Sequence, residues 1–367
     1  MENRDGYLAL SLTGIFSTAT YHKLIAAAGN AAALFQASDS FFQKFKGLRR
    51  SSVEAFLTRR ERVDPEKAMK RFEEQGIFWT TLEDPDYPDL LREVHVPPLT
   101  LFMKGKRLRC GDFPLAVEGT RRCSHYGQRA VEEITGGLPA QVTVVSGMAS
   151  GIDGHAHRAA LAQGKKTIAV LGTGVDVIYP SVNRGLYRDL LGKGTLVSEF
   201  PPGTTPQKHH FPQRNRIISG LSRGVLVVES SRKSGSLITA NFALEQGRDV
   251  FAVPGSIFRG SCTGTNELIK EGAVPVTRGS DISAFWGLEE KGVVKKKRAP
   301  VSLTEDEKTV INHLNADEAV SMEEISALLE GRLPTGRLST ALLNLKMKKC
   351  VLELDSRRFV LKNEDES

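Results

Sequence analysis

Several common signatures are missing from this 367-residue sequence. No apolar run reaches the roughly 18 residues that a membrane-spanning helix needs. The opening segment, MENRDGYLALSLTG, has no basic start followed by a long apolar stretch, so it does not resemble a secretory signal. We therefore expect a soluble protein of the cytoplasm.

Cysteine is scarce and scattered along the chain. The four cysteines are Cys110, Cys123, Cys262 and Cys350, and none lies two residues from another. Zinc and redox motifs need closely spaced pairs, and disulfide frameworks belong to small secreted domains. We expect four reduced structural thiols, no disulfide and no metal site.

Nucleotide-binding signatures are incomplete. GKKT at 164–167 lacks the upstream glycine of a P-loop, because Ala159 stands in its place. GTGVDV at 172–177 begins like a dinucleotide fingerprint, but Val177 occupies the third glycine position. The sequence therefore gives no support for a bound cofactor or for P-loop ATP hydrolysis.

Positive charge is in excess, and it is unevenly distributed. The net charge is +7, whereas residues 302–367 contain nine Lys and Arg against thirteen Asp and Glu, a net of −4, which leaves +11 on residues 1–301. A basic surface suits a polyanionic partner. Any nucleic acid is therefore expected to bind outside the C-terminal segment.

Residues 1–75 are expected to be helical, because apolar residues recur there at helical spacing. Asp64-Pro65 is typical of a helix start. FKGLRR (45–50) has the form of a helix–glycine–helix turn, so this segment resembles SAM or helix-hairpin-helix domains. Such turns can hold DNA phosphates, but more often they only join helices.

From about residue 110 the pattern changes to alternating strands and helices, and residues 76–290 are expected to form one domain. The expected strands are FPLAVE (113–118), VTVVS (142–146), TIAVLG (167–172), TLVSE (195–199), GVLVVES (224–230), DVFAVPG (249–255) and AVPV (273–276). Most are continuous apolar runs, which are typical of strands buried on both faces of a parallel sheet. We predict an α/β domain with an extended Rossmann-like, mostly parallel sheet.

A basic segment, KGVVKKKRAP, is expected to be a solvated linker over residues 291–301. In the unit that follows (302–367), Thr304–Glu307 and Ser321–Glu324 each fit a capping box. A third helix at about 335–348 and two strands around Asp355-Ser356 complete the pattern of a winged helix.

Ligands of open parallel sheets bind at the carboxyl ends of the strands, so the loops there are the candidate sites. GTRRCSHYG (119–127) opens a helix and offers backbone N–H groups to a phosphate, to which Arg121 adds a charge. In SGMASGIDGHAH, Asp153, His155 and His157 raise the possibility of catalysis. The two histidines lie two residues apart and point to different sides of a helix, so we expect no catalytic or metal-binding role.

The segment PPGTTPQKHHFPQRNRIISGLS (201–222) is dense in cations around one aromatic ring. It contains the candidate residues Lys208, Phe211, Arg214, Asn215 and Arg216. Cations hold phosphates while a ring stacks on a base, as single-stranded nucleic acid requires; alternatively, Phe211 fills the core and the arginines are only solvated. Pro206 and Pro212 favour an irregular, exposed loop.

A last candidate loop is SSRKSGSLITA (230–240), where the cations Arg232 and Lys233 precede a helix start. A helix N-terminus favours anions. Several such loops on one sheet edge would form a continuous basic groove.

The motifs GTRRCSHYG, SGMASGIDGHAH, VLGTGVDVIYP, SEFPPG, FPQRNRIISGLS, SGSLITA, GRDVFAVPG and GTNELIKEGA, in this order, resemble those of the DprA (Smf) DNA-processing family. The resemblance implies a non-enzymatic protein that binds single-stranded DNA, forms homodimers, and loads the RecA recombinase during natural transformation. It matches Arg121, Lys208 and Phe211 to DNA-contacting residues. It also places the dimer surface around Leu244, Asn266, Ile269 and Lys270.

One residue departs from the family pattern. Glu118 ends the strand before GTR, where the family usually has an apolar residue, and a carboxylate buried there without a partner would be costly. Two other functions remain open. One is a nucleoside-monophosphate phosphoribohydrolase, although PGSIFRGSCTGTNEL lacks that family's glycine pair. The other is a regulator that binds duplex DNA through the winged helix.

Overall fold

The structure is a computed structural model of the 367-residue chain. It describes residues 1–109, 111, 113–288, 302–314, 319–329, 331–354 and 358–361. Cys110, the expected linker at 291–301 and the expected turn at Asp355-Ser356 lie outside the described residues.

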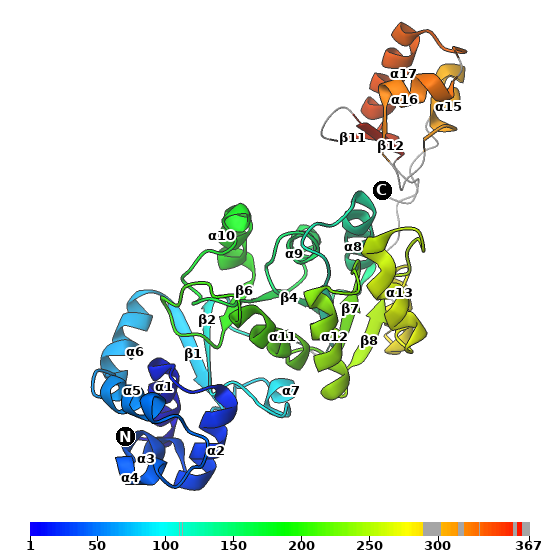
Figure 1. The fold of residues 1–367 in the computed structure, drawn as a ribbon. Coiled ribbons are helices and arrows are strands. Elements are labelled where there is room, and N and C mark those ends of the chain that lie inside the picture. Colours follow the sequence, from blue (N-terminus) through cyan, green and yellow to red (C-terminus); the bar gives the residue numbers. More distant parts are fainter. Residues whose placement is uncertain are drawn as a thin grey trace.

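Six helices form the N-terminal part of the chain (Figure 1). They are α1 (Asn3–Thr13), α2 (Thr18–Ala28), α3 (Ala31–Gln36), α4 (Asp39–Phe42), α5 (Arg50–Arg60) and α6 (Pro65–Glu74). The predicted start of α6 is confirmed, since the Asp64 side chain accepts a hydrogen bond from the Lys67 backbone N–H. Tyr21, Phe42 and Phe56 are buried where these helices meet.

The central domain is built on a nine-stranded sheet in the order β1-β2-β6-β5-β4-β3-β7-β8-β9. Seven strands run parallel: β3 (Phe113–Glu118), β4 (Val142–Ser146), β5 (Thr167–Val170), β6 (Thr195–Ser198), β7 (Gly224–Val227), β8 (Asp249–Ala252) and β9 (Val274–Pro275). These are the seven strands expected from the sequence. Apart from the half-buried Phe113, the apolar side chains of β3 to β8 are buried on both faces, as the continuous apolar runs predicted, whereas the edge strand β9 is partly exposed.

The sequence analysis missed the other two strands. β1 (Ile77–Thr81) and β2 (Thr100–Gly105) pair antiparallel to each other, and β2 continues the sheet antiparallel to β6. They lie beside the N-terminal helices in Figure 1, and Val175, Phe72 and Phe102 share one core cluster. The sheet therefore begins at residue 77 rather than near residue 110.

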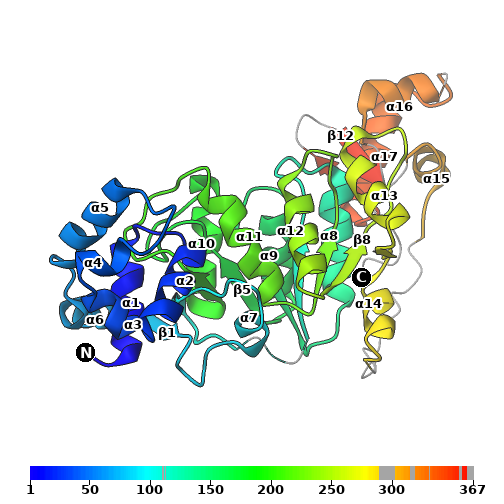
Figure 2. The same cartoon turned by 60° about the horizontal axis from the view of Figure 1, so that its bottom comes forward.

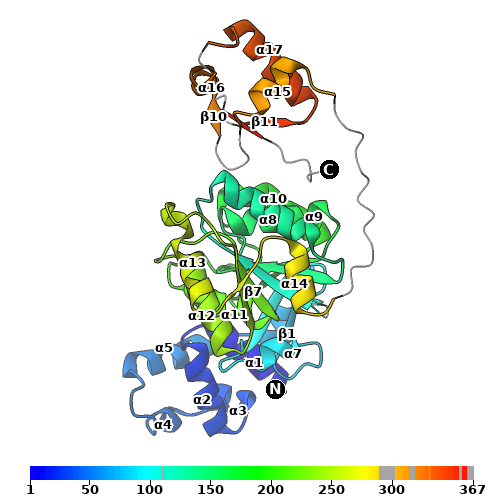
Figure 3. The ribbon, with the colours of Figure 1, turned by 90° about the vertical axis from the view of Figure 1, so that its right-hand side faces the viewer.

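Helices cover both faces of the sheet, which Figures 2 and 3 show from two further directions. α8 (His125–Gly137), α9 (Ile152–Ala162) and α14 (Gly279–Phe285) share one core cluster with β3, β4, β7 and β8. The other large cluster joins the sheet to α7 (Asp89–Arg92), α11 (His210–Gly220), α12 (Gly235–Glu245) and α13 (Thr263–Lys270). α10 (Arg184–Lys193) packs on β5 and β6. This layered arrangement is the expected α/β fold.

The C-terminal part contains three helices and a small sheet among its described residues. The helices are α15 (Glu305–Ile311), α16 (Met322–Leu328) and α17 (Thr335–Met347); the strands are β10 (Val320–Ser321), β11 (Val351–Leu354) and β12 (Arg358–Leu361), in the order β10-β12-β11. Both predicted capping boxes are present, at Thr304 and at Ser321. The sequence analysis missed β10, which is two residues long.

Within the described residues, no helix combines the length and the apolar character that crossing a membrane requires. The same part of the chain holds no group of three or more His, Cys, Asp or Glu side chains suited to a metal ion.

Candidate nucleic-acid interface

The predicted loops meet at one edge of the sheet. β3, β4, β5, β6 and β7 are parallel and stand side by side, so the segments that follow them share the carboxyl edge. A pocket of about 80 Å³ opens among four of these segments. It is lined by Arg121, Gly147, Met148, Ala149, Ser150, Leu171, Gly172, Thr173, Tyr179, Pro180, Phe211 and Arg214.

Two aromatic rings and a guanidinium form one rim of this pocket. The ring centroids of Phe211 and Tyr179 are 5.4 Å apart, and the Arg121 guanidinium carbon lies 5.6 Å from the Phe211 centroid. Gly172 allows this contact, because a Cβ there would lie 2.9 Å from a Phe211 ring carbon. The sequence analysis missed Tyr179; its only signal was an aromatic residue beside Pro180 in a loop at the sheet edge.

The segment 201–222 was expected to be an irregular, exposed loop. This is correct up to residue 209 and wrong beyond it. Phe211 lies in the first turn of α11, which begins at His210. Pro212 is compatible with this turn, because the N–H groups there have no partner within the helix. The helix presents Phe211 on a rigid backbone at the pocket.

Arg214 lies beneath the pocket as a buried cation. Its side chain is next to Gly147, and its Nε and Nη1 atoms have no hydrogen-bond partner among the described residues. Arg214 faces the buried carboxylates of Glu118 and Asp153, so the unusual Glu118 has a counterion. The interior therefore holds one guanidinium and two carboxyl groups directly under the candidate site.

Burial and mutual repulsion perturb both carboxylates. Burial raises the pKa of Glu118 well above its usual value, and the neighbouring Asp153 raises it further, whereas Arg214 opposes the shift. The pKa of Asp153 is also raised by burial, against the effects of Arg214 and of the Ala149 N–H that its carboxylate accepts. One proton shared by the two carboxyl groups would leave the cluster neutral.

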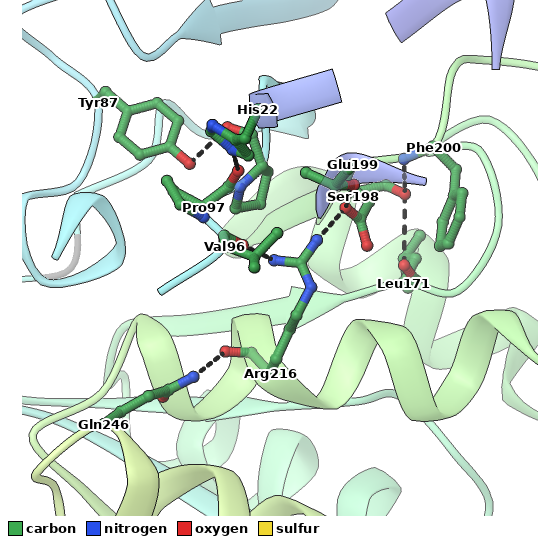
Figure 4. Close-up of polar contacts among 12 residues, drawn as sticks. His22, Tyr87, Val96, Pro97, Leu171, Ser198, Glu199, Phe200, Arg216 and Gln246 are labelled. Carbon is green, nitrogen blue, oxygen red and sulfur yellow. Dashed lines mark hydrogen bonds and ion pairs between the residues drawn. The ribbon is translucent and has the colours of Figure 1, made fainter. Parts of the chain in front are cut away.

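Arg216 and Asn215 are occupied by contacts within the protein, and Figure 4 shows those of Arg216. Arg216 forms an ion pair with Glu199, whose side chain is 9% exposed, and donates a 2.7 Å hydrogen bond to the Val96 carbonyl. Asn215 is buried and its Nδ2 donates to the Gly235 carbonyl at 3.3 Å. Both side chains thus attach α11 to neighbouring segments.

The remaining predicted cations are exposed. Lys208 precedes α11 and makes no ion pair or side-chain hydrogen bond within the described part of the chain. Arg232 and Lys233 follow β7, and Arg232 pairs with Glu267 of α13 at 2.9 Å. The exposed cations therefore border the edge on both sides of β3.

The two histidines of the 147–157 segment lie in different environments, as predicted. His157 is fully buried beside Thr167, with 2.7 Å between Nδ1 and Oγ1, and burial lowers its pKa to about 3. His155 is half-buried and faces Glu132. A neutral core histidine and a separate surface histidine do not form a catalytic pair.

The residues assigned to dimerisation occupy two helices. Leu244 on α12 is 60% exposed, and Lys270 on α13 is exposed and pairs with Glu267. Asn266 bonds to the backbone of Gly255 in both directions, and Ile269 packs partly against the core. Of the four, Leu244 and Lys270 offer surface to a partner.

Comparison with known proteins identifies the family of this chain. Residues 78–287 match the family of DNA recombination-mediator protein A. The chain belongs to this family. The family is one of recombination mediators rather than enzymes, and the match spans the whole nine-stranded sheet apart from residue 77.

Relatives and solved structures agree with the family assignment. The DNA processing protein DprA of Streptococcus pneumoniae is 48% identical over 231 residues, which cover 62% of this chain and 80% of that protein. The crystal structure of the S. pneumoniae protein superposes with a TM-score of 0.60 at 46% identity, over 65% of this chain and 83% of its own. DNA processing protein A of Helicobacter pylori, whose structure concerns its binding of single-stranded DNA, gives 0.52 at 28% identity, over 57% of this chain and 97% of its own.

Proposed function

We propose that the carboxyl edge of the sheet binds single-stranded DNA, and that the protein protects incoming strands and loads RecA onto them during natural transformation. The observation that carries the proposal is the rim formed by Arg121, Phe211 and Tyr179 above the buried Arg214. A cation beside accessible aromatic rings is what a flexible strand of phosphates and bases requires. The family membership supports the same reading.

The residues divide into two roles. Arg121 and Lys208 are free to contact phosphates, and Phe211 with Tyr179 offers rings on which a base stacks. Arg214, balanced by Glu118 and Asp153, lies below these residues and lines the pocket. In this proposal the other residues predicted from the sequence act less directly: Asn215 and Arg216 position α11, while Arg232 and Lys233 extend the basic edge past β7.

We also propose how the parts of the chain are used. Residues 1–75 form a SAM or helix-hairpin-helix-like domain, 76–290 the DNA-binding and dimerisation domain, 291–301 a linker, and 302–367 a winged helix. The order of helices and strands in the last segment supports that assignment. The homodimer forms through α12 and α13, and the protein acts in the cytoplasm.

Fluorescence anisotropy with labelled single-stranded and duplex oligonucleotides tests the proposed site. We expect a preference for the single strand. Phe211→Ala should weaken binding at least about fivefold, because stacking contributes about 1–3 kcal/mol per base. Lys193→Ala, an exposed change at the end of α10, is the matched control. Unchanged affinity in both Phe211→Ala and Arg121→Ala would refute the site.

A further inference from the structure

Two large apolar side chains project into solvent from the β8 loop, residues 253–262, which follows β8. Ile257 is 79% exposed and Phe258 is 92% exposed, the highest value for a large hydrophobic residue in the described part of the chain. Apolar surface that stays in water adds nothing to the core. The phenyl ring at the tip of this loop is therefore available to a partner.

The base of the β8 loop is held in place by α13. Oδ1 of Asn266 accepts the Gly255 N–H at 3.1 Å, and its Nδ2 donates to the Gly255 carbonyl at 3.0 Å. The buried Cys262 packs on the same glycine, because a Cβ on Gly255 would lie 2.4 Å from its sulfur. Both ends of the loop are thus fixed, and Phe258 projects from a supported turn.

Hydrogen bonds join the β8 loop to the loops beside it. The strands β3, β7 and β8 are parallel neighbours, so the segments that follow them leave the same carboxyl edge of the sheet. The Tyr126 hydroxyl, in the first turn of α8, donates to the Pro254 carbonyl at 2.6 Å. The Gly264 N–H donates to the carbonyl of Ser230, which follows β7, at 2.7 Å. The β8 loop therefore continues the edge that carries the candidate site.

Exposed cations lie between the pocket and the β8 loop. Arg121 and Arg122 are exposed after β3, and Arg232 and Lys233 are exposed after β7. Arg232 also pairs at 2.9 Å with Glu267 of α13, the helix that follows the β8 loop. Cations that hold phosphates beside a ring that stacks on a base form the combination that single-stranded nucleic acid needs.

We propose that Phe258 is a second stacking platform, on which a base of the single strand stacks after the strand has left the pocket at Phe211. The inference rests on the proposed function and extends it from one pocket to a path along the carboxyl edge. On this path the strand passes the cations after β3 and β7 before it reaches the β8 loop.

The spacing of the strands sets the length of this path. The segment after β4 lines the pocket, and β4, β3, β7 and β8 are consecutive in the sheet. Three spacings of roughly 4.8 Å separate β4 from β8, a total of about 14 Å. At the rise of roughly 3.4 Å per nucleotide in B-DNA, about four nucleotides cross this distance, and an extended strand needs fewer. One oligonucleotide can therefore contact Phe211 and Phe258 together.

A second copy of the chain is the competing partner for the exposed ring. Leu244 and Ile269, which are proposed for dimerisation, lie on α12 and α13, the helices that cover one face of the sheet. Phe258 instead lies at the carboxyl edge near exposed cations. Two copies that met there would bring like charges together, whereas the phosphates of a strand would neutralise them.

Fluorescence anisotropy with an oligothymidine of about 15 nucleotides tests the platform in the full chain. Phe258→Ala should weaken binding at least about fivefold, and Phe258→Leu should weaken it as much because leucine offers no π-face. Phe258→Tyr should keep most of the affinity. Met347→Ala, at a position 75% exposed on α17, is the matched control and should bind as the wild type does. Equal thermal unfolding of these variants checks that the fold is intact.

A second measurement reports stacking directly. An indole introduced by Phe258→Trp should lose fluorescence when the oligothymidine binds, because stacking on a base quenches it. The wild-type chain contains two tryptophans, and its own titration supplies the signal to subtract. Met347→Trp places an indole at the control position, where no quenching is expected.

The inference is overturned if Phe258→Ala binds as tightly as the wild type, if Phe258→Leu keeps the wild-type affinity, or if the introduced indole is not quenched. A changed oligomeric state of Phe258→Ala in sedimentation velocity would also overturn it, because the ring would then meet a second copy. Binding that Phe211→Ala weakens and Phe258→Ala does not would refute this inference alone. Absence of single-strand binding by the wild type would refute the proposed function and this inference with it.

Discussion

The guanidinium of Arg214 occupies the space that a side chain at residue 147 would fill. A Cβ built on Gly147 would lie 1.5 Å from Nη1 of Arg214, far inside van der Waals contact. Glycine after β4 is therefore what allows a buried cation to reach the underside of the pocket. The buried pair Glu118 and Asp153 supplies the charge that retains it there.

Gly147→Ala should displace Arg214 and separate it from its carboxylate partners. Breaking a buried charge cluster costs about 3–5 kcal/mol, so the free energy of unfolding should fall by an amount of that order. Urea denaturation measures the change. The matched control is Gly185→Ala in α10, where a Cβ meets open space and the helix should gain up to about 1 kcal/mol. Equal stability of the two variants would contradict the packing described for Arg214.

Stability should depend on pH through Glu118. Its pKa in the folded protein is raised, so the folded state holds the proton more tightly than the unfolded state. Its contribution is therefore fully present below the unfolded pKa of about 4.5 and is lost as the pH rises through the folded pKa. Glu118→Gln cannot lose a proton, so its stability relative to the wild type should increase as the pH rises above the unfolded pKa. Denaturation of both proteins at several pH values measures this difference. If the free energies of unfolding of the wild type and of Glu118→Gln changed with pH in the same way, the assignment would be wrong.

Removal of Arg216 should loosen three segments together. Arg216→Ala leaves the largely covered Glu199 without its ion pair and removes the hydrogen bond to Val96. Loss of one member of a buried pair costs about 3–5 kcal/mol. Thermal or urea unfolding checks this, and Glu199→Gln in the same chain should recover part of the loss. Arg50→Ala, which breaks a solvent-exposed pair with Asp39, is the control and should have little effect. A similar result for both arginines would contradict the positioning role of Arg216.

Strand affinity should fall with salt, and single substitutions should change the slope. Each phosphate contact to a single strand contributes about 0.7 to the slope of log K against log salt concentration. Lys208→Ala should therefore lower the magnitude of the slope by about that amount. Anisotropy titrations across a salt series measure it, with Lys193→Ala as the control. An unchanged slope would remove Lys208 from the proposed interface.

The C-terminal unit should contribute little to strand binding, because residues 302–367 carry nine basic and thirteen acidic residues. A chain that ends at Val301 should keep most of the affinity of the full chain for single-stranded DNA. The same anisotropy assay compares the two. A large loss of affinity on truncation, at equal stability of the central domain, would show that the charge argument is wrong.

Much of the architecture could be predicted from local sequence features. The seven parallel strands were identified because each is a continuous apolar run, and residues buried on both faces must be apolar. Asp64, Thr304 and Ser321 marked helix starts because capping depends on neighbours three residues away. The strands β1 and β2 were missed because their pairing with each other and with β6 is not a local property.

The residues of the candidate site could be predicted only in part from the sequence. The sequence by itself determined which residue types stand at the carboxyl edge, since Arg121, Lys208 and Phe211 follow strands that the apolar pattern defines. Only the tertiary structure decided their neighbours. The folded chain packs the ring of Tyr179 against that of Phe211, and it pairs Arg216 with Glu199.

The same distinction holds for the charged groups. Sequence showed that Glu118 was unusual at the end of its strand, but its partner Arg214 comes from a helix 96 positions later in the chain. Likewise, Glu132 and His155 meet only because α8 packs on α9. Strand and helix formation depend on nearby residues, so sequence determines them. Charge pairing depends on atoms a few ångströms apart, and only the folded chain brings those atoms together.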